Sequence, residues 1–237
     1  MRRVSGDGGY SYSGTNYESQ HHYSSNSWSI GSEMSRAAYN GLIGVILLYG
    51  FGLNVLLVTT CAQYFANINP IALIIGYLVL SITGIVISRK SDNPWVSFLG
   101  YNLVVVPIGI VLSVCLQGQS VVSITYALTT TAGVVAIMLI ASTMFPNIFL
   151  SLGRILGLTL FAIIIVELLL AIFGVATPTF LDVIVAGLFC LYIGYDWAKA
   201  QSEDPTPDAA VDACVGLYLD IVNLFLRILS LYSRRRD

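Results

Sequence analysis

Charged side chains are scarce in this sequence. Only 10% of its 237 residues are Asp, Glu, Lys or Arg, whereas 56% are hydrophobic. A water-soluble domain usually carries about 25% charged residues, so the polar groups present here are too few to cover a water-facing surface. The net charge of −2 also lacks the basic excess that a nucleic-acid-binding face requires. The composition therefore predicts burial in lipid and no nucleic-acid partner.

The motifs of several chemical sites are also missing. The four cysteines form no C-x-x-C pair and each lies in an apolar stretch, so we interpret them as packing residues and not as a metal site or disulfide framework. We find no nucleophile with a base, no metal-ligand cluster and no glycine-rich phosphate loop. Arg2 and Arg3 precede a polar stretch, which does not resemble a cleavable signal peptide. We expect no enzyme and no bound cofactor, and a first helix that acts as its own targeting signal.

Residues 1–35 differ in character from the rest of the chain. They are rich in Ser, Gly, Tyr and Asn and have few aliphatic side chains. Such a segment buries too little apolar area to offset its ordering entropy. We therefore predict a disordered cytoplasmic tail over 1–35, followed by one membrane domain over 36–237. His21 and His22 lie in this tail without convergent partners, which argues against a metal role.

Seven apolar segments follow the tail, each close to the ~20 residues that a membrane-spanning helix needs. They cover roughly 37–61, 70–88, 96–117, 120–143, 155–174, 179–198 and 210–231. Uniformly apolar runs of this length favour helices over β-barrel strands, which alternate over about ten residues. The fold class is therefore all-α, a polytopic membrane protein. Gly153 and Gly157 have the spacing that permits close helix contact, although this motif is weak.

Basic residues flank the predicted segments on alternate sides. Those before the first segment and after the second, fourth and sixth are Arg2, Arg3, Arg36, Arg89, Lys90, Arg154 and Lys199. The connections near 62–69, 118–119 and 175–178 have none, which predicts a cytoplasmic N-terminus. A seventh full crossing then puts Arg234, Arg235 and Arg236 outside. The last segment either crosses against the rule or enters and returns, and its length favours a full crossing.

Ionisable side chains inside predicted spans are costly and mark candidate functional sites. Four stand out: Glu167, Asp196, Asp220 and Arg227. At 100° per residue, one arc of the last segment gathers Asp212, Gly216, Asp220, Asn223, Arg227, Ser230 and Arg234. Such a stripe cannot face lipid, so we predict that the C-terminal helix is enclosed by the other six. The stripe either lines a cavity or forms a polar seam that only packs helices together.

Asp196 and Asp220 lie on segments joined by a short polar turn, so these segments are antiparallel neighbours. At 1.5 Å per residue the two carboxylates differ in depth by roughly 9 Å if both helices are straight. If they approach, they cannot both ionise easily, and they titrate as a unit. Carboxylate oxygens also suit Ca²⁺, although two carboxylates fall short of its usual six to eight ligands. The pair therefore predicts a proton-sensitive element and a weak calcium site.

Three other acids need an interpretation. Glu167 lies mid-membrane and is either an ion-pathway or proton-relay carboxylate, or a structural group that is protonated or paired with Arg227. Both interpretations stay open. Asp182 and Asp212 lie near predicted helix starts, where an acid stabilises the N-terminus. We predict them to be helix caps.

Two stretches resemble the Bax inhibitor-1 family, which comprises the transmembrane Bax inhibitor motif proteins. The resemblance is to the bacterial members. Residues 192–196 read Tyr-Ile-Gly-Tyr-Asp, and residues 217–225 carry the pattern Leu-Tyr-Leu-Asp-x-x-Asn-Leu-Phe. The resemblance implies seven helices with the seventh enclosed, and a pH-sensitive calcium leak gated by an aspartate pair. Asp196 and Asp220 match that pair position for position. The implied location is a bacterial cytoplasmic membrane.

The sequence departs from the family pattern in two places. Trp197 and Ala198 stand where the family often has a Thr-Gln pair, and the second span has no basic residue before Arg89. In many family members a basic residue of the second helix can engage the aspartate pair. Any contact that closes the channel in this protein must therefore differ from that one. We expect a calcium leak channel or transporter whose partners are membrane lipids. The alternative is a non-conducting regulator that binds other membrane proteins, either a protease modulator or a suppressor of stress or cell death.

Overall fold

The computed structural model of the chain describes residues 33–65 and 69–234, and within these ranges it contains helices and no strands. The helices are α1 (Arg36–Phe65), α2 (Pro70–Lys90), α3 (Pro94–Cys115), α4 (Val121–Met144), α5 (Pro146–Ser151), α6 (Gly153–Ile172), α7 (Thr179–Ser202) and α8 (Pro207–Arg234). All but α5 are long and apolar enough to cross a membrane. The predicted all-α polytopic fold is therefore confirmed. Most of the predicted tail, residues 1–35, lies outside the described residues.

The helix starts follow from local sequence signals. The Asn93 side chain accepts a hydrogen bond from the Trp95 backbone N–H at 3.0 Å, and Pro94 occupies the first position of α3. The Ser120 hydroxyl accepts from the Ser123 backbone N–H at 3.0 Å at the start of α4. These side chains satisfy amide groups that have no partner within the helix. The short α5, which starts at Pro146, lies in the connection between the predicted segments 120–143 and 155–174.

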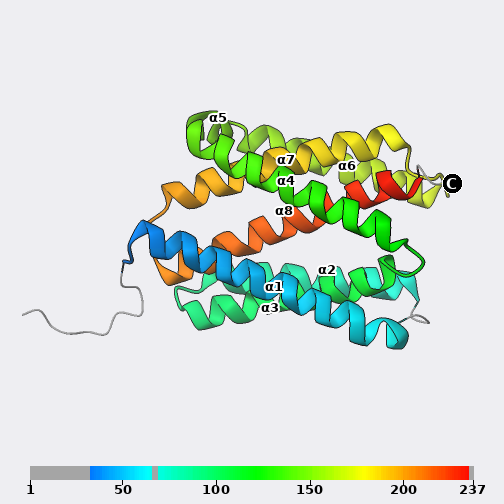
Figure 1. Cartoon of the computed structure of the whole chain (residues 1–237), viewed down its shortest axis with the longest axis horizontal. Coiled ribbons are helices and arrows are strands. Elements are labelled where there is room, and N and C mark those ends of the chain that lie inside the picture. The colour runs from blue at the N-terminus through cyan, green and yellow to red at the C-terminus, as the bar shows by residue number, and fades with distance from the viewer. Residues whose placement is uncertain (1–32, 66–68, 235–237) are drawn as a thin grey trace, which may run out of the picture.

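The last helix lies in the middle of the bundle (Figure 1). Helices α1, α2 and α3 lie on one side of α8, and α4, α5, α6 and α7 lie on the other. Helix α8 packs against α1, α2, α3, α4 and α7, and α6 reaches it through an ion pair between Glu167 and Arg227. More of its membrane window is buried than in any other described span. This is the enclosed position that the polar stripe predicted.

Glycines set two of the closest helix contacts. A side chain on Gly84 would collide with the backbone carbonyl of Gly100, and a side chain on Gly100 with that of Gly84. Because neither glycine has a side chain, α2 and α3 can approach closely. Gly153 lies against the ring of Tyr195 on α7. Nothing lies within 4 Å of where a side chain on Gly157 would project. Of the two glycines in this motif, Gly153 makes a close helix contact and Gly157 does not.

Helix α8 runs the whole length of the bundle, from the end where α1 begins to the opposite end (Figure 1). A full crossing is what the length of the segment predicted. Arg234, which the predicted orientation would put on the outer side, ion-pairs with Asp182 at 3.3 Å and donates a hydrogen bond to the Thr177 carbonyl at 2.6 Å. Its charge is therefore compensated within the protein, at the helix C-terminus where a cation is favourable.

Candidate functional site

Asp196 on α7 and Asp220 on α8 are brought together. Their carboxyl groups lie within hydrogen-bonding reach of each other. Asp220 is only 6% exposed, and its Oδ2 has no hydrogen-bond donor among the described residues. Two carboxylates this close in a low-dielectric interior cannot both stay ionised without a large electrostatic cost. A proton shared between them removes that repulsion and supplies the missing donor.

Gly216 explains how the two carboxylates meet despite their different depths. It precedes Asp220 by one helical turn, which is a rise of about 6 Å. The nearest atom to a Cβ added at Gly216 would be Oδ2 of Asp196, at clashing distance. Asp196 therefore lies level with Gly216, against the bare backbone of α8, and reaches along that helix toward Asp220.

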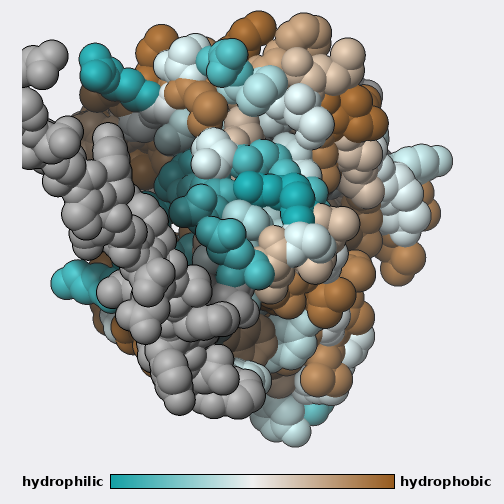
Figure 2. Space-filling model, turned by 90° about the vertical axis from the view of Figure 1, so that its left-hand side faces the viewer, coloured by the Kyte–Doolittle hydropathy of each residue, from teal (hydrophilic) through white to brown (hydrophobic). Residues whose placement is uncertain are grey.

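A polar cavity of about 240 Å³ opens beside this pair. It is lined by Arg89, Asp196, Lys199, Ala200, Glu203, Asp212, Ala213 and Gly216. Figure 2 shows the end of the molecule where α1 begins, with hydrophilic surface gathered in the middle and apolar surface around it. Arg89 and Asp196 both line this cavity. The second span has no basic residue in its middle, but Arg89 in the last turn of α2 supplies a cation beside the aspartate pair. The carboxyl pair thus lies at the inner end of a charged, polar recess.

The first turns of α8 are held by serines of α2 and α3. The Ser88 hydroxyl donates to Asp212, and the Ser97 hydroxyl donates to Asp208 at 2.6 Å. Because α8 begins at Pro207, Asp208 lies in its first turn and Asp212 lies a turn further in. The prediction that Asp212 caps the helix is wrong, since its carboxylate joins α8 to α2.

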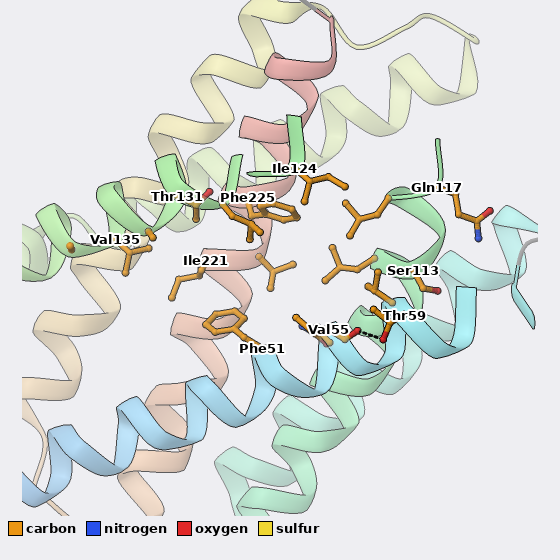
Figure 3. Close-up of a pocket in the computed structure, with 18 of the residues that line it drawn as sticks. Phe51, Val55, Thr59, Ser113, Gln117, Ile124, Thr131, Val135, Ile221 and Phe225 are labelled. Atoms are coloured by element: carbon orange, nitrogen blue, oxygen red, sulfur yellow. Dashed lines mark hydrogen bonds between the residues drawn. The ribbon is translucent and has the colours of Figure 1, made fainter. Parts of the chain in front are cut away.

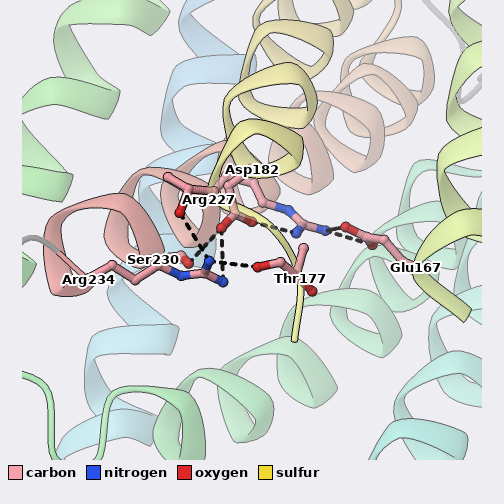
Figure 4. Close-up of polar contacts among 7 residues, drawn as sticks. Glu167, Thr177, Asp182, Arg227, Ser230 and Arg234 are labelled. Carbon is pink, nitrogen blue, oxygen red and sulfur yellow. Dashed lines mark hydrogen bonds and ion pairs between the residues drawn. The ribbon is translucent and has the colours of Figure 1, made fainter. Parts of the chain in front are cut away.

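A second polar cluster lies at the other end of α8 (Figure 4). Arg227 ion-pairs with Glu167 at 2.6 Å and with Asp182 at 3.0 Å. Asp182 lies between Arg227 and Arg234 and accepts a hydrogen bond from Ser230 at 3.0 Å. Its side chain is 2% exposed and makes no capping hydrogen bond at the start of α7. Asp182 therefore lies in the first turn of α7, as predicted, but it is not the capping residue, and its carboxylate engages two arginines of α8.

The predicted site residues therefore fall into two groups. Arg227 follows Asp220 by about 10 Å along the helix, and Glu167 joins Arg227 and not the aspartate pair. Asn223 lies between the groups, donates to the Leu219 carbonyl of its own helix at 2.8 Å, and lines a pocket together with residues of the second polar cluster. Glu167 forms an ion pair with Arg227, as the structural interpretation predicted. A role of Glu167 in an ion pathway or proton relay stays a prediction.

The comparison with known proteins agrees with the motif-based resemblance. Residues 32–237 match the protein-family model described as "Inhibitor of apoptosis-promoting Bax1". The chain belongs to the Bax inhibitor-1 family. No curated protein sequence matches the chain.

In this Bax inhibitor-1 family protein, the described residues gather no group of three or more His, Cys, Asp or Glu side chains that could hold a metal ion. Two carboxylates fall short of the ligand number that Ca²⁺ prefers. An ion passing the pair would need water or backbone carbonyls to complete its coordination. Calcium at Asp196 and Asp220 stays a prediction.

Sequence reasoning missed three contributors to these sites. Arg89 was interpreted only as a sign of orientation, Gly216 only as part of the stripe, and Asp182 only as a cap. The sequence did contain a signal for Asp182. It lies at the start of one span, and Arg227 and Arg234 lie near the end of the next span, which is antiparallel, so all three are at the same depth. For Gly216, the spacing of one turn before Asp220 was the available signal.

Proposed function

We propose that this Bax inhibitor-1 family protein is a pH-sensitive calcium leak of the membrane, in which Asp196 and Asp220 form the proton-sensitive element. The observation that carries the proposal is the carboxyl pair at the inner end of the polar cavity. Asp196 lines that recess, whereas Asp220 is buried behind it. Protons can therefore reach the pair from one end of the molecule.

A change of protonation would act directly on the packing of α7 against α8. With one shared proton, the carboxyl groups attract each other. With both ionised, they repel across a close contact between these helices, where Gly216 leaves no side chain to separate them. Repulsion in a low-dielectric site is strong, so the two protonation states favour different helix positions. The same two oxygen-rich groups attract a divalent cation when ionised.

The test is calcium flux into liposomes that contain the purified protein, measured at several pH values between about 6 and about 8, because a coupled carboxyl pair titrates as a unit. Wild type is compared with Asp196→Asn, Asp220→Asn and the double variant. We expect a pH-dependent flux whose pH dependence disappears in the double variant. Asp204→Asn is the matched control, because it removes one negative charge from an exposed position outside the cavity and should keep the wild-type profile.

Two outcomes would contradict the proposal. An unchanged pH profile in the double variant would remove the aspartate pair as the sensor. The absence of flux from folded protein at every pH would remove the leak itself and favour a regulator that binds other membrane proteins.

A further inference from the structure

The helices around α8 form two groups whose backbones stay apart. Helices α1, α2 and α3 form one group, and α4, α5, α6 and α7 form the other (Figure 1). Within the described residues, no Cα atom in a helix of one group lies within 8 Å of a Cα atom in a helix of the other. A lateral cavity of about 840 Å³ lies between them, and Figure 3 shows Phe51 and Val55 of α1 facing Thr131 and Val135 of α4 across it. A tilt of one group against the other therefore breaks no closely packed pair of helices other than those formed with α8.

Helix α8 connects the two groups, and each of its ends is bonded to a different one. Near its start it is bonded to α1, α2 and α3, through the serine contacts described above and through the Cys214 thiol, which donates to the Ile43 carbonyl at 3.5 Å. Near its end, the Tyr232 hydroxyl lies 3.1 Å from the Thr130 hydroxyl of α4, and the two arginines pair with acids of α6 and α7. The α4–α7 group is thus held to α8 at the end far from the polar cavity, and that end is the pivot of a tilt.

The part of α7 that carries Asp196 is bound on its other side to α4. The Ser142 hydroxyl donates to the Gly194 carbonyl at 2.6 Å, and the Trp197 indole N–H donates to the Thr143 hydroxyl at 2.9 Å. An aromatic ring of α5 also lies against the bare backbone at Gly194. Helix α7 cannot leave α8 alone without breaking these contacts, so a force on α7 tilts the whole α4–α7 group.

Hydrogen bonds from α1 hold the end of α7 beside the polar cavity. Both terminal nitrogens of the Arg36 guanidinium donate to the Glu203 carbonyl at 3.0 Å, and one of them also donates to the Ala200 carbonyl at 3.4 Å. The Gln201 amide donates to the Asn40 side-chain oxygen at 2.9 Å. Carbonyls at a helix end lack partners within the helix, and a cation is favourable there. These bonds cross from one group to the other at the end opposite the pivot, where a tilt separates the groups most.

We propose that Arg36 and Asn40 are positioning residues that hold the α4–α7 group closed against α1. Their bonds to the end of α7 break when the group tilts open about the far end of α8. Opening moves Asp196 away from Asp220 and widens the polar cavity, because Glu203 and the end of α7, which line it, move with the group. The inference rests on the proposed function, to which it adds the contact that keeps the leak closed.

The test measures the tilt without calcium, by pulsed electron–electron double resonance between spin labels on the full chain in liposomes. One label pair spans the groups at the cavity end, on Leu99→Cys of α3 and Ile148→Cys of α5. A second pair spans them at the far end, on Tyr64→Cys of α1 and Val121→Cys of α4. All four side chains are more than half exposed. The buried Cys214 stays, and the other native cysteines are replaced: Cys61→Ala, Cys115→Ala and Cys190→Ala.

Three variants are compared with wild type in this background. Arg36→Met removes the three hydrogen bonds of the guanidinium. It should raise the ratio of long to short distances at the cavity end about fivefold, the effect of one lost hydrogen bond, while distances at the far end stay unchanged. Asn40→Leu removes a bond between the groups without uncapping α7, and should shift the cavity-end distances in the same direction. Arg154→Met is the matched control, because Arg154 is exposed on α6 and forms no hydrogen bond or ion pair with the described residues.

Cavity-end distances that stay unchanged in both Arg36→Met and Asn40→Leu would overturn the proposal. So would distances that lengthen equally at both ends, because the groups would then separate without a pivot. The calcium assay of the previous section distinguishes this failure from that of the leak. Calcium flux with unchanged distances refutes the role of Arg36 alone, whereas the expected distance shifts in a protein that conducts no calcium refute the leak and leave the tilt of the two groups standing.

Discussion

The ion pairs of Arg227 make a sharp prediction about stability. Arg227 compensates two acids at once, Glu167 at 2.6 Å and Asp182 at 3.0 Å. The change Arg227→Met keeps the length and apolar stem of the side chain but removes its charge. Asp182 then retains Arg234, at 3.3 Å. Glu167 retains no ion-pair partner among the described residues.

The magnitude follows from the surroundings of Glu167. Its side chain is 26% exposed, but on a membrane helix that exposure is toward hydrocarbon and does not stabilise a charge. Removing one partner of such a pair costs about 3–5 kcal/mol, because an uncompensated charge stays behind. For a chain of this size, we expect the midpoint of thermal unfolding to fall by about 10 °C. Adding Glu167→Gln to Arg227→Met should recover part of that loss.

The assay is thermal unfolding of the detergent-solubilised protein, followed by the loss of its monodisperse peak in size-exclusion chromatography. Lys199→Met is the matched control. Lys199 pairs with Glu203 at 3.7 Å, with side chains 44% and 40% exposed, and an exposed pair contributes about 1 kcal/mol or less. An Arg227→Met variant as stable as Lys199→Met would refute the argument. So would a Glu167→Gln addition that destabilises the protein further.

Three further changes test other parts of the structure. Gly216→Ala places a methyl group against the Asp196 carboxylate, and should reduce the pH dependence of flux while the yield of folded protein stays at the wild-type level. Arg89→Gln removes a cation that lines the polar cavity together with Asp196. The midpoint of the pH response of calcium flux should move upward, because a neighbouring cation disfavours protonation of a carboxylate. Asn93→Ala removes the cap on the Trp95 amide and should cost about 1 kcal/mol in thermal unfolding, without altering the pH profile.

Much of the fold could be predicted because length and hydropathy alone define membrane spans. The predicted segments agree with the seven long helices to within several residues at most ends. Caps such as Asn93 and breakers such as Pro94 mark the boundaries. The short α5 was missed because six residues carry too little periodic signal to distinguish one helical turn from a loop.

The inward faces of most helices could not be predicted. Lipid and protein core are both apolar, so α1 to α4 and α6 have nearly uniform hydropathy around their axes, and periodicity does not show which side is buried. This is why the lateral cavity between α1 and α4 has no sequence signature. Helix α8 is the exception, since its polar stripe must avoid lipid, and that stripe correctly predicted its enclosed position.

Partners across the bundle were harder to predict than positions along one helix. The stripe placed Asp212, Asp220 and Arg227 on one face, but their partners are spread over three neighbouring helices. Asp212 bonds with α2, Asp220 meets α7, and Arg227 pairs with α6 and α7. Sequence spacing within a helix fixes depth and direction, whereas the neighbour at that depth depends on the packing of the whole bundle.

The contacts of α8 also limit how it can respond to a charge change at Asp220. Its first turns are held by hydrogen bonds from Ser88 and Ser97, and its last turns by the ion pairs of Arg227 and Arg234. Sliding the helix as a rigid body would break both sets of contacts at once. Between Asp212 and Arg227, apart from the aspartate pair, the described residues show two hydrogen bonds to other helices. The Tyr218 hydroxyl accepts from Asn54, and the Cys214 thiol donates to the Ile43 carbonyl at 3.5 Å. We therefore expect repulsion between Asp196 and Asp220 to move α7 away from the middle of α8, or to bend α8 near Gly216, while its two ends stay in place.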